Sequence, residues 1–103
     1  MMGQDVIQPW DGEPSKAVRL ATGKLAEEAN ELAGICARIA IQGLAGIDPK
    51  SGKSNADALA EEMSDVLAGM NFVNEHTSIT ANHDRMEKKL SGYRLWFAMI
   101  GIK

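Results

Sequence analysis

The chain has 103 residues, with 11 basic and 14 acidic side chains, 45% hydrophobic residues and one cysteine. A chain of this length folds as one domain around a single hydrophobic core, because only much longer chains divide into two domains. One cysteine excludes an internal disulfide and a zinc site built from paired cysteines. A net charge of −3 without a lysine-rich run argues against a nucleic-acid partner, because binding phosphates requires a basic surface.

The sequence predicts a cytoplasmic protein that does not bind membranes. No window reaches the roughly 20 consecutive apolar residues that cross a bilayer. The first ten residues hold no basic side chain ahead of an apolar run, as a secretory signal peptide would. The lone cysteine also fits a reducing compartment.

Residues 1–13 lack sustained periodicity and are expected to form an N-terminal arm, with Trp10 as its one large anchor, ahead of a single domain over residues 14–103. Pro14 suits the first turn of a helix, where a missing N–H is tolerated. From there to about Gly43 the apolar residues recur at helical spacing, which predicts one long helix with a weak point at Gly23.

Residues 43–55 have the composition of a loop, rich in glycine, serine and lysine. Within it, Gly46 to Ser54 reads GIDPKSGKS and resembles a phosphate-binding loop. That loop needs four residues between its glycines and a preceding strand. Five residues separate Gly46 from Gly52 and no strand precedes them, so we reject this assignment.

Two further helices are expected. One begins near Asn55, with Ser54 or Asn55 as its cap, and ends at residues 76–78. The other begins near Thr80 or Asn82 and has Gly92 as a weak point. No alternation of period two appears, so the predicted class is all-α: a helical bundle of three to four helices per chain, completed by oligomerisation because three helices leave a wide apolar surface.

The most informative residues are acids on the first two helices. Glu27, Glu28 and Glu31 form EExxE, and Glu61, Glu62 and Asp65 form EExxD. Residues three apart are neighbours on a helix surface, so each motif offers a pair of carboxylates that can bind one cation. Helical geometry places Glu28 on the apolar stripe and Glu62 at the margin of its own, where an unpaired carboxylate is costly.

If the two helices pack antiparallel, the pairs converge into four oxygen donors. Such donors suit Mg²⁺, with Mn²⁺ as a substitute. A di-iron bundle needs Glu-x-x-His on two helices. His76 and His83 have no acid three residues earlier, so that chemistry is disfavoured, and both are expected to be exposed near helix ends.

The segments 24–32 (KLAEEANEL) and 59–67 (LAEEMSDVL) resemble the MazG-like all-α nucleoside triphosphate pyrophosphohydrolases, which are related to the dimeric dUTPases. Their signature is EExxE followed by ExxD on the next helix, and the resemblance extends over roughly residues 20–95. It implies that Mg²⁺ is held by four carboxylates, which are those of Glu28, Glu31, Glu62 and Asp65.

The family also has a lysine and an arginine after ExxD that hold phosphate oxygens, and Lys89 and Arg94 in KKLSGYR match that pattern. Lys88 can take the place of Lys89 in this role. Equally, Lys89 and Arg94 can be solvent-exposed residues that hold no phosphate. Lys24 can contact phosphate or pair with Glu28. The aromatic residues are expected to pack in the core or between subunits, although they can also stack on a base; they are Trp10, Tyr93, Trp96 and Phe97.

The predicted function is therefore Mg²⁺-dependent hydrolysis of a nucleoside triphosphate, with Glu27 or Glu28 orienting or deprotonating the attacking water. The resemblance also implies a homodimer or homotetramer. The alternative is a non-catalytic helical interaction module whose acids only solubilise an assembly, and it predicts that Glu28 is exposed.

Overall fold

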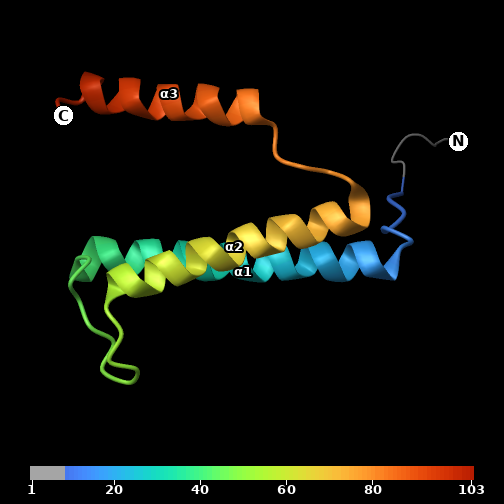
Figure 1. Ribbon diagram of the computed structural model, residues 1–103, viewed down its shortest axis with the longest axis horizontal. Coiled ribbons are helices and arrows are strands. Elements are labelled where there is room, and N and C mark those ends of the chain that lie inside the picture. The colour runs from blue at the N-terminus through green and yellow to red at the C-terminus, as the bar shows by residue number, and fades with distance from the viewer. Residues whose placement is uncertain (1–8) are drawn as a thin grey trace, which may run out of the picture.

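The computed structural model describes residues 9–103 and contains three helices, α1 (Lys16–Gln42), α2 (Asn55–Thr77) and α3 (His83–Met99) (Figure 1). Over these residues there is no strand, only an isolated antiparallel bridge between Ile47 and Ser54. The predicted all-α class is confirmed. The first eight residues of the predicted arm lie outside the described part of the chain.

Each helix begins at a side chain that caps it. The side-chain oxygens of Ser15, Ser54 and Asn82 each accept a hydrogen bond from the backbone N–H three residues later. Pro14 therefore precedes the cap of α1. The sequence had indicated that it lies in the first turn of the helix, and this prediction is wrong. The glycines at 23 and 92 interrupt neither helix, because one glycine costs only about 1 kcal/mol relative to alanine.

The helices α1 and α2 pack against each other as an antiparallel hairpin (Figure 1). The buried residues of this hairpin include Ala21 on α1 and Gly69 and Val73 on α2. A Cβ atom at Gly69 would lie 3.3 Å from the Cα and Cδ1 of Leu25. The missing side chain therefore lets the two helices approach closely at this level.

Asn55 fastens the loop between α1 and α2. It is fully buried, and its side chain accepts a hydrogen bond from Arg38 Nε at 3.0 Å. Its amide nitrogen donates to the Gly43 carbonyl at 2.9 Å and to Gln42 Oε1 at 3.2 Å. A Cβ at Gly46 would come within 2.7 Å of that nitrogen, so the loop closes tightly around one satisfied polar side chain.

The third helix packs against neither α1 nor α2, and Figure 1 shows it standing apart from the hairpin. The radius of gyration is 19.2 Å, whereas a compact chain of this length has about 13 Å. The apolar side chains of α3 are exposed, including Tyr93 and Phe97. The chain thus has three helices, within the predicted number. These helices do not form a closed bundle within one chain.

None of the helices in the described range combines the length and the hydropathy needed to cross a bilayer.

Candidate metal centre

The acidic motifs meet in the seam between α1 and α2. Glu28 on α1 and Glu62 on α2 are half-buried there, and Asp65 lies at the exposed edge, one turn after Glu62. One carboxylate oxygen of each of these three residues lies within 4.8 Å of the others. Antiparallel packing therefore brings together three of the four predicted ligands.

Glu31, the fourth predicted ligand, is exposed beside this cluster. Its carboxyl group is close enough to raise the pKa of Glu28, and its charge also raises the pKa of Glu62. It lies outside the set of three oxygens that share one centre. It is nevertheless close enough to add to the negative potential of the site.

Two oxygens of the cluster are buried without a hydrogen-bond donor within the described residues, namely Glu28 Oε2 and Glu62 Oε2. Burial, followed by contact with the neighbouring carboxyls, raises the pKa of Glu28 above 4.5. Burial and the charges of Glu31, Asp65 and Glu61 likewise raise the pKa of Glu62. Buried carboxylates are normally paired or bound to a metal. A donor set made only of carboxylate oxygens fits a hard cation such as Mg²⁺.

Lys24 lines an open cavity of about 540 Å³ that Glu28 and Asp65 also line. Its ammonium group pairs with Glu27 at 3.5 Å, and both side chains are well exposed. The sequence had left open an ion pair between Lys24 and Glu28. In the structure, Lys24 forms its ion pair with Glu27 instead. The cavity is lined by Lys24, Glu28, Asp65, Ala68, Gly69 and Phe72.

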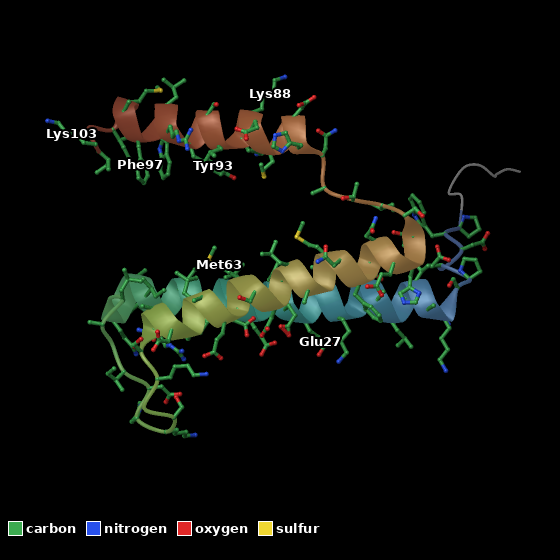
Figure 2. The ribbon with its side chains drawn as sticks, viewed as in Figure 1. Glu27, Met63, Lys88, Tyr93, Phe97 and Lys103 are labelled. Carbon is green, nitrogen blue, oxygen red and sulfur yellow. The ribbon has the colours of Figure 1, made fainter. Side chains whose placement is uncertain are left out.

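Glu27 projects from the side of the hairpin that faces away from α3, whereas Met63 projects toward α3 (Figure 2). The acidic and the apolar sides of the hairpin are therefore opposite each other. A second, apolar cavity of about 340 Å³ lies between Leu25, Leu67 and Met70 and the segment that leads to α3. The hairpin thus has a polar face and an apolar face.

Sequence reasoning missed Phe72, which lines the acidic cavity and contacts the ring of His76 edge-on at 4.8 Å between centroids. Residues seven apart lie on the same face of a helix. The spacing between Asp65 and Phe72 was thus the signal that could have placed this aromatic ring beside the acids.

Lys89 and Arg94, the phosphate-holding residues predicted on the third helix, do not lie at this site within one chain. Lys89 lies with Arg85, Lys88 and Tyr93 around a shallow cavity on α3 itself. The helix that carries Lys89 and Arg94 contacts neither helix of the hairpin. One chain therefore separates its basic third helix from its own carboxylates.

A loop lysine does reach an acid of the second motif. Lys53 Nζ lies 2.7 Å from Glu61 Oε1, and this hydrogen bond and the charge of Glu61 raise the pKa of Lys53. The contact ties the loop to the start of α2. It also gives Glu61 a cationic partner, whereas the buried oxygens of Glu28 and Glu62 have no partner in the described part of the chain.

The other aromatic and histidine candidates are exposed in the single chain. Trp10, predicted as an anchor, is 97% exposed, and Trp96 and Phe97 contact each other at 5.4 Å between ring centroids. His76 and His83 are exposed, as predicted.

Comparison with protein-family models, with curated proteins and with solved structures gave no match to this chain. Any functional inference therefore depends on the sequence motifs and on the geometry described above.

Proposed function

We propose that this protein hydrolyses nucleoside triphosphates to the monophosphate and pyrophosphate in a reaction that requires Mg²⁺. The observation that carries the proposal is the convergence of Glu28, Glu62 and Asp65 from two helices, with two buried carboxylate oxygens that have no donor among residues 9–103. A solvated acidic surface would leave these oxygens in water. The resemblance of both motifs to the MazG-like family supports the same chemistry.

The residues present fit a divalent cation. Glu28, Glu62 and Asp65 would hold it, with Glu31 as a further ligand, and Mn²⁺ would substitute because it accepts the same oxygen donors. When bound, the ion neutralises charge on the phosphate oxygens and lowers the pKa of a water molecule.

The chain's own residues supply orientation and proton transfer. Water adds across the anhydride bond between the α- and β-phosphates, and its proton passes to a carboxylate. Glu28 borders the cavity directly, and Glu27 lies one residue away with Lys24 as its partner. Either carboxylate can accept this proton. The turnover of variants at Glu27 and at Glu28 would show which of the two does so. Lys24 lines the cavity and can attract phosphate there, and Phe72 offers a ring face for a base.

We also infer a cytoplasmic homodimer or homotetramer, in which Lys89 and Arg94 contact phosphate. The alternative function, a non-catalytic assembly module, draws support from the exposed apolar side chains of α3. It predicted an exposed Glu28, whereas Glu28 is half-buried.

The test is to incubate the protein with each common ribo- and deoxynucleoside triphosphate and Mg²⁺, and to separate the products. We expect monophosphate and pyrophosphate, no diphosphate, and loss of turnover in EDTA. Asp65→Asn should lower turnover at least 100-fold while the helical circular dichroism remains, because it removes one ligand charge and little volume. Asp57→Asn, in the first turn of α2 and outside the cluster, is the control and should keep full activity. Equal activity of Asp65→Asn and the wild type would refute the metal assignment.

A further inference from the structure

The loop between α1 and α2 leaves the hairpin on its acidic side. Figure 1 shows the loop projecting away from α3, and Glu27 projects in the same direction (Figure 2). The loop carries two lysines, Lys50 and Lys53, and one acid, Asp48. It therefore brings basic side chains of the same chain to the side of the hairpin on which α3 does not lie.

The backbone of Lys53 is fixed within this loop. Its N–H donates to Ser51 Oγ at 3.2 Å, and its carbonyl accepts a hydrogen bond from Asp48 N at 2.9 Å. Two residues later the chain is anchored by the buried side chain of Asn55. A side chain on a fixed backbone loses less entropy when it binds a ligand, so Lys53 is better prepared for binding than a lysine on a free loop.

The ammonium group of Lys53 is held beside the candidate metal centre. It lies 2.7 Å from Glu61 Oε1, and Glu61 directly precedes the predicted ligand Glu62. The side chains of Lys53 and Glu61 are 40% and 58% exposed. Exposed ion pairs contribute little stability, so this contact can be exchanged for a stronger anion.

Two lysines flank the acid cluster along the axis of the hairpin. Lys24 lies one turn before Glu28 on α1, at the end away from the loop, and it lines the cavity. Lys53 reaches Glu61, which lies one turn before Asp65 on α2, at the end near the loop. Four residues of a helix span about 6 Å, a distance that two linked phosphoryl groups can bridge.

We propose that Lys53 binds the β- and γ-phosphates of the substrate, which leave as pyrophosphate, and that it releases Glu61 when it does so. This inference rests on the proposed function. The nucleoside then lies toward Lys24 and Phe72, and the α-phosphate lies at the carboxylates that would hold the cation. Lys53 neutralises charge on the leaving group, which stabilises the transition state.

The first test measures binding without turnover. The lysines are acetylated with and without Mg²⁺ and inorganic pyrophosphate, and each site is followed by mass spectrometry. We expect millimolar pyrophosphate with Mg²⁺ to slow the acetylation of Lys53 several-fold relative to Mg²⁺ alone. A nucleoside monophosphate with Mg²⁺ should not protect Lys53, because it lacks the two outer phosphates.

Lys50 is the matched control for this experiment. It is exposed in the same loop and forms no ion pair within residues 9–103, so its acetylation should not change. Unchanged acetylation of Lys53 in pyrophosphate would overturn the proposal, as would equal protection of both lysines.

The second test uses steady-state kinetics. Lys53→Gln should raise KM for the triphosphate about tenfold, because a charged hydrogen bond to phosphate is lost. Lys53→Arg should keep most of the wild-type affinity, and Lys50→Gln should keep all of it. Unchanged KM in Lys53→Gln would overturn the proposal.

Glu61→Gln separates phosphate binding from a structural ion pair. It breaks the same contact as Lys53→Gln, so a structural role predicts the same rise in KM for both variants. If Lys53 binds phosphate, Glu61→Gln frees its ammonium group and should leave KM unchanged or lower it. Equal rises would therefore refute the proposal. If the wild type hydrolyses no triphosphate, the proposed function fails, while protection by pyrophosphate still decides whether Lys53 binds phosphate.

Discussion

Glu28 is the residue at which stability and function conflict. Its carboxylate lies in the seam of the hairpin, beside three other acids, and one of its oxygens is buried with no donor among the residues that the structure describes. Replacing it by the isosteric glutamine removes the repulsion. We therefore predict that Glu28→Gln raises the melting temperature in EDTA by a few degrees and loses the stabilisation that millimolar Mg²⁺ gives the wild type.

Circular dichroism melts with EDTA and with Mg²⁺ check this prediction. Glu75→Gln, on an exposed part of α2 away from the cluster, is the matched control and should leave both temperatures unchanged. Identical melts of the wild type with and without Mg²⁺ would count against a preformed cation site.

The raised pKa values of Glu28 and Glu62 also set the direction of a pH effect. A group with a raised pKa in the folded state favours folding when it is protonated, so its contribution is complete below 4.5 and is lost as the pH rises through the folded value. In EDTA, urea unfolding should therefore show that the wild type gains stability relative to Glu28→Gln as the pH falls from 7.5 to 5. A constant difference between the two proteins would contradict the assigned burial.

The sequence predicted the acid cluster because its geometry depends on spacing within two helices. Three-residue spacing placed Glu62 beside Asp65, and the apolar pattern placed Glu28 in the seam. The partner of Lys24 and the position of Phe72 depend on the register of the two helices and on rotamers. No pattern along one helix contains that information.

At the scale of elements, the contact between Gly69 and Leu25 fixes how closely α1 and α2 approach. Gly34 lies within α1, and a Cβ atom added there would meet no atom within 4 Å, so Gly34→Ala should gain up to about 1 kcal/mol from helix propensity. Gly69→Ala gains the same propensity but places its Cβ 3.3 Å from Leu25, so we expect a smaller gain or a loss. Urea unfolding of both variants measures the difference, and equal gains would show that the helices are further apart.

Asn55, the first residue of α2, should matter more for stability than any polar residue of the loop that it closes. Asn55→Ala removes three side-chain hydrogen bonds and leaves the Arg38 donor and the Gly43 carbonyl without this partner. We expect a loss of about 2–3 kcal/mol in the free energy of unfolding. Asn30→Ala, at an exposed position of α1, is the control and should be neutral. An equally small effect of Asn55→Ala would mean that the loop is not closed in this way.

Helix boundaries were predictable because caps and apolar periodicity are local. Ser54 was one of the two caps expected for α2, Asn82 was one of the two starts expected for α3 and is its cap, and α2 ends where the pattern fades. The separation of α3 was not predictable, since an apolar stripe specifies that a helix must pack but not against which surface.

For the whole molecule, the exposed apolar surfaces predict that stability depends on protein concentration. The melting temperature should rise over a hundredfold increase in concentration, because association favours the folded state. Leu67→Asp, at an exposed apolar side chain of α2, should lower the melting temperature and the sedimentation mass together. Leu95→Asp alters an equally exposed side chain on the side of α3 opposite Tyr93 and Phe97. It should change neither the melting temperature nor the sedimentation mass. Melting independent of concentration would refute this assembly.

The isolated position of α3 has a consequence for the order of events when the chain is made. The hairpin is complete before α3 is synthesised, and its contacts are between neighbouring helices, so it can form quickly. Within one chain the third helix then stays apart from the hairpin, with Trp96 and Phe97 exposed to water. In the proposed homo-oligomer the last folding step is bimolecular, and its rate rises with the concentration of newly made chains. Slow synthesis prolongs the interval in which α3 can adhere to the wrong surface.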